Sequence, residues 1–167
     1  MRTSRLADRA AEIEGVYRRR YHAFLRVSVG ILRDEGLAEE AVHEGFVRAL
    51  RHRRRFDGRG PLEAWIWRIV VNEARRIGAA ERRASELTSR TSADEAPSTN
   101  GAGDYGAVEA LVAALPERQR LALFLRYHAD LDYDAIAVAL EVKPGTVAAT
   151  LHAAHAALRR QLVEVER

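Results

Sequence analysis

Apolar positions recur at helical spacing along most of the chain, and the pattern breaks once. Three apolar stripes precede the break and four follow it, with members three and four residues apart. They predict helices over about 13–32, 38–50, 62–77, 108–115, 121–128, 133–140 and 147–162. No segment alternates apolar and polar residues as a half-buried strand does. The sequence therefore predicts an all-α fold.

The break covers residues 84–106, with the sequence ASELTSRTSADEAPSTNGAGDYG. It is rich in Ser, Thr, Ala and Gly and contains almost no large apolar residue, a composition typical of a flexible linker. We therefore expect two small helical domains, residues 1–83 and 107–167, joined by a flexible linker at 84–106.

Charge is distributed unevenly along the chain. The net charge is +3, but residues 13–83 hold 16 Arg against 10 Asp and Glu, whereas residues 107–167 have a net charge of −1. A polyanionic partner should therefore meet the first domain. The absence of cysteine excludes disulfides and thiolate metal sites and fits a cytoplasmic location. No apolar run has the length of a membrane span or a signal-peptide core, so we expect no membrane partner.

The segment 51–76, RHRRRFDGRGPLEAWIWRIVVNEARR, is the most informative part of the chain. It brings together cations that bind phosphate, aromatic rings that stack on bases and an asparagine amide that reads base edges. This combination favours an unstacked single strand of nucleic acid over a closed duplex. A solvated helix end carrying surface arginines is the alternative interpretation.

The two tryptophans of this segment are two residues apart. On a helix they point roughly 200° apart, so only one fits fully in the apolar stripe. Trp65 matches the stripe, which places Trp67 nearer the surface. We therefore expect Trp67 to lie exposed beside a group of polar and cationic side chains, Arg68, Asn72, Arg75 and Arg76. Core packing is the alternative for both rings.

The last two predicted helices, with the turn 141–143 between them, have helix-turn-helix dimensions, although an ordinary helical hairpin has them too. Six residues of the second helix should face outward: Ala148, Ala149, His152, Ala153, His155 and Ala156. This face carries no Arg or Lys before Arg159. Lys143, Thr146 and backbone N–H groups could hold a phosphate. The helix is therefore a weak DNA reader or a surface for a protein.

No motif in the sequence indicates enzymatic chemistry. We find no phosphate-binding loop, nucleophile elbow, HExxH motif or dinucleotide fingerprint. His152 and His155 share a helix face, but no third metal ligand is near them in sequence. We therefore expect a protein that is not an enzyme, with no catalytic residue, metal, cofactor or small-molecule substrate.

Several short motifs occur in a specific order. They are Glu40–Phe46 (EAVHEGF), Phe56–Gly60 (FDGRG), Ala64–Ile69 (AWIWRI), Asn72, Leu115–Arg120 (LPERQR), Tyr133–Ala137 (YDAIA) and Gly145–Val147 (GTV). In this order, and on two sides of a linker, they resemble the bacterial RNA polymerase sigma factors of the extracytoplasmic-function (ECF) group of the sigma-70 family. The resemblance covers nearly the whole chain apart from the linker and the first dozen residues.

The resemblance assigns roles to the two domains. It implies that the first is sigma region 2, which binds core RNA polymerase and recognises and melts the minus-ten element, and the second is sigma region 4, a helix-turn-helix. It also implies that Glu40, His43 and Glu44 contact core polymerase and that the 56–60 loop captures a flipped-out base. The DNA-binding residues expected from patterns and resemblance together are Arg53, Arg54, Arg55, Phe56, Asp57, Gly58, Arg59, Trp67, Arg68, Asn72, Arg75, Arg76, Lys143, Thr146, Ala149, Thr150 and His152. An anti-sigma protein is a candidate partner besides core RNA polymerase and promoter DNA.

The sequence departs from the family at its last helix. The family has basic residues where this chain has Ala148, Thr150, Ala153 and His155, and a turn glycine where it has Glu141. This predicts weak recognition of the minus-thirty-five element. Two hypotheses follow: an alternative sigma factor that directs core polymerase to promoters and opens them, or a sigma-fold regulatory or adaptor protein whose Ala-rich last helix binds protein.

Overall fold

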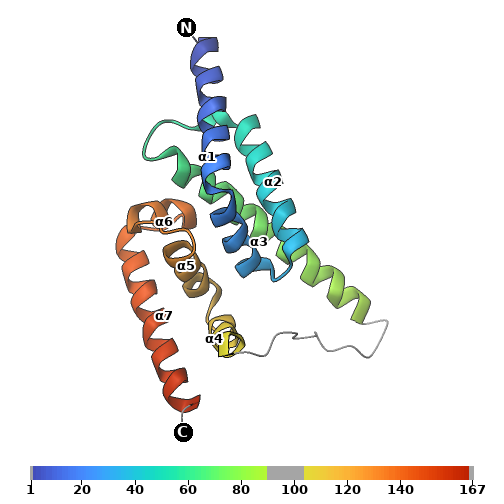
Figure 1. Ribbon diagram of the computed structural model, residues 1–167, viewed down its shortest axis with the longest axis vertical. Helices are drawn as coiled ribbons and strands as arrows, with labels where there is room; N and C mark the ends of the chain where they lie inside the picture. Colours follow the sequence, from blue (N-terminus) through green and yellow to red (C-terminus); the bar gives the residue numbers. More distant parts are fainter. Residues whose placement is uncertain (1, 90–103, 166–167) are drawn as a thin grey trace.

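A computed structural model describes residues 2–89 and 104–165 and shows only helices, connected by short turns, in those ranges (Figure 1). The helices are α1 (Arg2–Leu32), α2 (Glu35–Arg51), the short 3-10 helix η1 (Arg53–Arg55), α3 (Leu62–Ser89), α4 (Asp104–Ala113), α5 (Glu117–Tyr127), α6 (Tyr133–Leu140) and α7 (Pro144–Val165). The predicted all-α fold is confirmed. We call α1–α3 the first module and α4–α7 the second module.

Aromatic side chains form the centre of the first module. The ring of Phe24 on α1 stacks on Trp67 of α3 with 3.7 Å between centroids, and meets Phe46 of α2 edge-on at 4.9 Å. The sharp turn between α1 and α2 is closed by Asp34, whose side chain accepts a hydrogen bond of 2.8 Å from the Leu37 N–H. This N-cap satisfies one of the free donors at the start of α2 and fixes where that helix begins.

Helices α2 and α3 cross at a glycine. A Cβ atom at Gly45 would lie 2.7 Å from Val70 Cγ2 and 3.1 Å from Val70 Cα. The second of these atoms belongs to the backbone of α3 and cannot turn aside. Gly45 therefore sets how closely the two helices approach.

A helix cap and one arginine stabilise the turns between the helices of the second module. The Arg120 guanidinium donates from Nη1 to the carbonyls of Ala113 and Leu115, at 2.9 and 3.0 Å, and closes the turn between α4 and α5. Asp132 caps α6 by accepting from the Ala135 N–H at 2.7 Å. The buried apolar side chains of this module include Leu121, Leu125, Ile136, Val147 and Leu151.

A non-glycine residue in the left-handed conformation ends α6. Glu141 has φ 56° and ψ 43°, and its N–H reaches the Val138 carbonyl at 3.3 Å. The Val142 N–H donates to the Ala137 carbonyl at 3.0 Å. Glycine is the usual residue for this kind of helix end. The turn nevertheless leads directly into α7, so α6 and α7 form the predicted helix-turn-helix.

The helices on either side of the predicted linker extend into it. Helix α3 continues to Ser89 and α4 begins at Asp104, so residues 84–89 and 104–106 are helical. Residues 81–88 are exposed, and the Thr88 hydroxyl donates to the Ala84 carbonyl at 3.0 Å. The apolar stripe stops there, in agreement with the exposure of this end of α3. The remainder of the predicted linker, residues 90–103, lies outside the described residues.

The two modules pack against each other. Helix α3 contacts α6, and α1 contacts α5 (Figure 1). At the second contact Gly30 of α1 faces Phe124 of α5, because a Cβ atom at Gly30 would lie only 2.8 Å from the ring. None of the described helices is long and apolar enough to cross a membrane.

Candidate nucleic-acid interface

An exposed loop with two left-handed glycines precedes α3. Gly58 has φ 78° and Gly60 has φ 96°, and nothing lies within 4 Å of a Cβ atom built at either position. Between them, the Arg59 N–H donates to Asp57 Oδ1 at 2.9 Å. The glycines are therefore required by the backbone conformation and not by crowding. The loop is held by one local turn and is otherwise open to solvent.

Phe56 anchors this loop to the first module. Its ring lies 5.6 Å from the ring of Trp65, and the Arg9 guanidinium covers it at 4.6 Å from the centroid. The ring is half-buried, so it fixes the start of the loop against the first module. The backbone and the side chains beyond it, from Asp57 onward, remain exposed.

Exposed arginines surround the loop. Arg54 and Arg55 of η1 are exposed, and the Arg59 side chain is 91% exposed. Arg53 is half-buried and donates from Nη1 to the Leu50 carbonyl at 2.7 Å, which ties η1 to the end of α2. Three of the four predicted phosphate-binding arginines of this segment therefore present their charge to solvent.

The predicted exposure of Trp67 is wrong. Its side chain is completely buried, stacked on Phe24. The expectation treated α3 as a helix with one buried stripe, but the first turns of α3 are enclosed, and four consecutive residues from Ala64 to Trp67 are buried. Trp67 cannot stack on a base in this arrangement.

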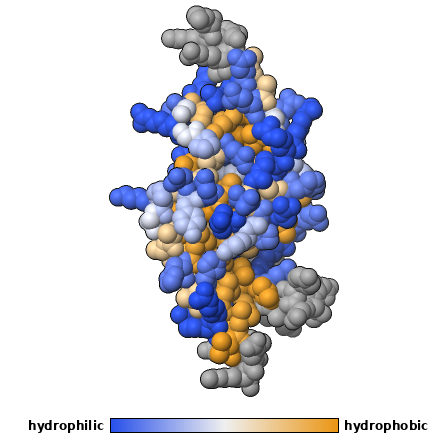
Figure 2. Space-filling view, turned by 60° about the vertical axis from the view of Figure 1, so that its left-hand side comes forward, coloured by the Kyte–Doolittle hydropathy of each residue, from blue (hydrophilic) through white to orange (hydrophobic). Residues whose placement is uncertain are grey.

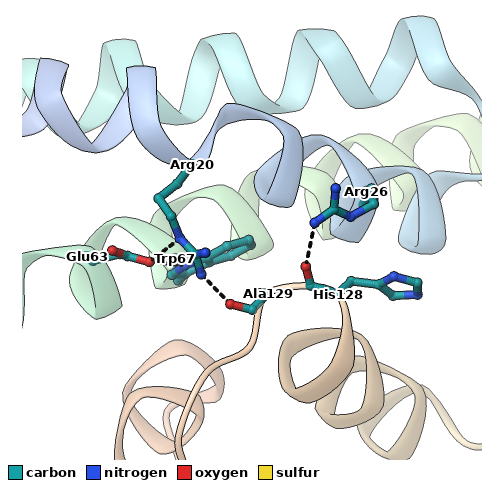
Figure 3. A network of polar contacts seen from close by, with 6 residues as sticks. All are labelled: Arg20, Arg26, Glu63, Trp67, His128 and Ala129. Atoms are coloured by element: carbon teal, nitrogen blue, oxygen red, sulfur yellow. Dashed lines mark hydrogen bonds and ion pairs between the residues drawn. The ribbon is translucent and has the colours of Figure 1, made fainter.

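The buried indole of Trp67 has a polar partner that sequence reasoning missed. Its Nε1 lies 3.4 Å from Glu63 Oε1, which also accepts from Arg20 Nε at 2.8 Å. Arg20 continues to the Ala129 carbonyl of the second module (Figure 3). The spacing of Glu63 four residues before Trp67 was a usable signal, because such residues are neighbours on a helix.

Arg76 pairs with a buried carboxylate that the sequence pattern did not reveal. Glu73 is only 2% exposed, accepts from Arg76 Nε at 2.8 Å and lies 3.3 Å from Nη2 of Arg48 on α2. The hydrogen bond to Glu73 raises the already high pKa of Arg76. Two guanidinium groups thus compensate one buried charge, which makes Arg76 a poorer phosphate ligand than its neighbours.

The remaining polar residues on the outer side of α3 meet the second module. Arg75 Nε donates to Glu117 Oε1 at 2.9 Å, and its Nη2 lies 3.4 Å from Glu117 Oε2. Glu141 lies 3.9 Å from Arg68 Nη1 and 3.5 Å from Asn72 Nδ2. Each of the three predicted DNA-binding residues therefore has an acidic neighbour on α5 or at the end of α6.

The predicted core-binding residues share one side of α2. Glu40 and His43 are exposed and Glu44 is partly exposed, while Ala41 and Val42 between them are buried. Their three- and four-residue spacing places them next to each other on the helix. The result is a compact acidic and polar patch on the outside of the first module.

The predicted DNA-facing residues of α7 carry little charge. Lys143, Ala149 and His152 are exposed, whereas the Thr150 hydroxyl donates to the Thr146 carbonyl at 2.7 Å and is used within the helix. The predicted outward residues Ala148 and Ala153 are also exposed, and two more, His155 and Ala156, are half-buried. Among the described residues, no group of three potential metal-ligating side chains occurs.

An exposed arginine-rich loop and helix in one module and a helix-turn-helix in the other are features of DNA-binding proteins. The family model "Sigma-70 region 2" matches residues 16–84, and "Sigma-70, region 4" matches residues 105–158. The chain therefore belongs to the sigma-70 family, as an ECF-type factor with regions 2 and 4. It is not an enzyme: a sigma factor binds core RNA polymerase and directs it to promoter DNA for transcription initiation.

Curated relatives agree with this assignment, and two solved structures share the fold. The RNA polymerase sigma-H factor of Pseudomonas aeruginosa is 27% identical over 156 residues, covering 84% of this chain and 81% of that protein. The sigma-E factor of Streptomyces coelicolor is 26% identical over 155 residues, covering 91% and 86%. The fold is shared with CnrH, solved with the cytosolic domain of CnrY (TM-score 0.71, 20% identity, 95% of each chain). It is also shared with the sigma factor RpoE of Bartonella quintana, solved with the anti-sigma factor NepR (TM-score 0.68, 20% identity, 93% of this chain and 99% of that one).

Proposed function

We propose that this sigma factor opens promoters with its first module, by gripping the separated minus-ten strand at the loop before α3. One observation carries the proposal: the exposed Arg54, Arg55 and Arg59 flank an open loop with two left-handed glycines. Cations beside an adaptable loop suit a backbone that bends around an extruded base. The factor would act in the cytoplasm, with functional domains at 1–83 and 107–167.

The roles within the first module follow from exposure. The phosphate contacts are assigned to the exposed Arg54, Arg55 and Arg59, with the half-buried Arg53 beside them in a lesser role, and the loop residues 57–60 receive the extruded base. Asn72 reads a base edge, and Arg68 and Arg75 bind the adjoining phosphates. The α2 patch of Glu40, His43 and Glu44 contacts core polymerase. Trp67 has no direct DNA contact in this proposal, because its ring is buried.

The second module contributes less to promoter affinity. Its helix-turn-helix presents alanines at 148, 149 and 153 and only one cation, Lys143, near the start of α7. Major-groove readers commonly use Arg, Lys, Asn or Gln at such positions. Recognition of the minus-thirty-five element is therefore weak, with Lys143 and Thr146 holding a phosphate and Ala149, Thr150 and His152 facing the groove.

The test is binding of the holoenzyme to a fork-junction promoter with a single-stranded minus-ten segment. The double variant Arg54→Gln/Arg55→Gln should weaken binding and lower the salt dependence by about 0.7 per lost single-strand phosphate contact, or roughly 1.4 in total. Binding to core polymerase should not change.

A matched control removes the same charge elsewhere. Arg18 and Arg19 are exposed on α1, so Arg18→Gln/Arg19→Gln changes net charge equally. If this control lowers the salt dependence as much as the loop variant does, the loop has no specific role and the proposal is wrong.

A protein partner is the second proposal, and exposed apolar surface favours it. Apolar surface gathers at the lower end of the molecule, where α4 and the C-terminal part of α7 lie (Figures 1 and 2), and Leu162 and Val163 of α7 are 45% and 53% exposed. Tyr127 is 63% exposed. The solved relatives named with the cytosolic domain of CnrY and with NepR indicate the class of partner, an anti-sigma protein.

The neutral surface of α7 also supports the alternative of a regulatory or adaptor role. Run-off transcription by reconstituted holoenzyme distinguishes a sigma factor that initiates transcription from an adaptor, because an adaptor would bind core polymerase without producing a transcript.

A further inference from the structure

We propose that Arg76 contacts core RNA polymerase and not promoter DNA, so that the core-binding surface of this factor extends from α2 onto α3. The inference rests on the proposed core contacts of Glu40, His43 and Glu44. It gives Arg76 a partner of definite chemistry, an acidic side chain on the surface of the polymerase.

The direction of Arg76 separates it from the proposed DNA ligands of α3. Asn72 and Arg75 meet acidic side chains of the second module. Arg76 instead pairs with Glu73, whose Oε2 also lies 3.3 Å from Nη2 of Arg48 on α2. Successive residues of a helix are turned by about 100°, so two neighbouring arginines can serve different sides. Arg76 therefore lies at the edge of α3 that borders α2.

Two carboxylates of the proposed core-binding patch lie near the Arg76 guanidinium. Its pKa is raised, mainly by the hydrogen bond to Glu73, and the charges of Glu40 and Glu44 raise it further. Four-residue spacing places Glu40, Glu44 and Arg48 in one row along α2. This row, together with Arg76 and Glu73, forms one surface on two helices, which we call the mixed-charge surface.

A buried carboxylate holds both arginines of the mixed-charge surface in place. Glu73 is 2% exposed, whereas the side chains of Arg48 and Arg76 are 51% and 56% exposed. A guanidinium has five N–H donors, so each arginine keeps donors for an outside partner while Glu73 orients it. A side chain that is already ordered loses less conformational entropy when a partner binds.

The net charge of the mixed-charge surface disfavours DNA. Three carboxylates stand against two guanidinium groups, so the surface has a net charge of −1. A sugar-phosphate backbone approaching Arg76 would be repelled by Glu40 and Glu44. A protein surface can instead match both signs. Core polymerase should therefore place a carboxylate opposite Arg76 and cations opposite the two glutamates.

The experiment measures binding of the full chain to core polymerase and, separately, to a single-stranded minus-ten oligonucleotide. Arg76→Gln should weaken core binding by about 1.5- to 5-fold, the range expected for one exposed ion pair, and added salt should reduce this difference. Oligonucleotide binding should not change. An arginine bound to a phosphate would instead lower the salt dependence of oligonucleotide binding by about 0.7.

A second pair of variants separates the contact from folding. Arg76→Gln leaves the buried Glu73 with Arg48 alone, which destabilises the first module. Glu73→Gln removes this buried charge, so Arg76→Gln is also measured in the Glu73→Gln background. Core binding should again fall by about 1.5- to 5-fold, while the urea midpoints of the two proteins differ little. Arg76→Lys should restore core binding, because the partner carboxylate requires a cation.

Arg82→Gln is the matched control for the loss of charge. Arg82 is exposed on the same helix and lines a cavity of about 240 Å³ together with Arg75 and Glu117, on the side of the second module. The control should leave core binding unchanged. If it weakens core binding as much as Arg76→Gln does, the effect is one of net charge and the inference is wrong.

Cross-linking gives an independent result. Because the sequence has no cysteine, Arg76→Cys provides a single site for a photoactivatable group in the holoenzyme on promoter DNA. We expect adducts with a polymerase subunit. Adducts with DNA alone would overturn the inference, and so would unchanged core binding in Arg76→Gln.

The proposed core-binding patch of α2 is judged separately, by Glu40→Gln/Glu44→Gln. If this variant binds core polymerase as well as the wild type, the assignment of the patch fails. If it binds more weakly while Arg76→Gln does not, the patch stands and only its extension onto α3 fails.

Discussion

Replacing Trp67 by alanine should damage folding rather than DNA contact. The side chain is fully buried and stacked on Phe24, and its N–H faces Glu63. Removing a buried tryptophan costs about 3–5 kcal/mol, because apolar burial is lost and a cavity remains. That is a large part of the roughly 5–15 kcal/mol that stabilises an ordinary domain. Trp67→Ala should therefore leave the first module largely unfolded or close to unfolding at 37 °C.

The assay is urea denaturation followed by far-UV circular dichroism, beside promoter opening by the holoenzyme. Asn72→Ala is the comparison, since Asn72 is exposed on the same helix. We expect its stability to change by less than about 0.5 kcal/mol, with promoter opening impaired. If Trp67→Ala instead unfolds at the wild-type urea concentration and loses only promoter opening, the packing argument is refuted and the indole acts on DNA.

Two further predictions concern the helix crossing and one histidine. Gly45→Ala should destabilise the first module by up to about 2 kcal/mol in urea denaturation, because overpacking against the Val70 backbone costs about 1–3 kcal/mol and the gain in helix propensity returns only about 1 kcal/mol. A higher midpoint would contradict the crossing geometry. Partial burial lowers the pKa of His128, and the nearby positive charge of Arg26 lowers it further. The folded chain therefore binds this proton less readily than the unfolded chain, so this contribution to stability is present above pH about 6.5 and is lost as pH falls below that value. Urea denaturation between pH 5.5 and 8 should show this loss as a lower midpoint at the acidic end, and His128→Gln should abolish the difference.

Periodicity was sufficient to predict where most helices lie, because α1, α2, α5, α6 and α7 each bury a stripe that repeats every three or four residues, but it did not give their ends. It was not sufficient for α3, where burial extends around the helix from Ala64 to Trp67. A stripe argument assumes one packed face. A helix enclosed by its neighbours shows its true environment only once the tertiary contacts are known, and the position of Trp67 was wrong for that reason.

The acidic residues show a second limit. Glu73, Glu117 and Glu141 look like surface charges in the sequence, yet the first is buried and the other two meet arginines 42 and 73 residues away. Pairing over such separations depends on how the two modules dock, which local patterns do not encode. By contrast, the predicted exposure of Arg54, Arg55 and Arg59 follows from local chemistry, because each lies in a short turn segment between apolar stripes.

The two indoles of this chain, Trp65 and Trp67, both lie in the first module. Trp67 is linked through Glu63 and Arg20 to the Ala129 carbonyl across the contact between the modules. Separation of the modules would rearrange this chain of polar groups around a ring that fluoresces. A Trp65→Phe variant would thus carry a built-in optical reporter, and its emission could follow the encounter with polymerase in real time without any attached dye.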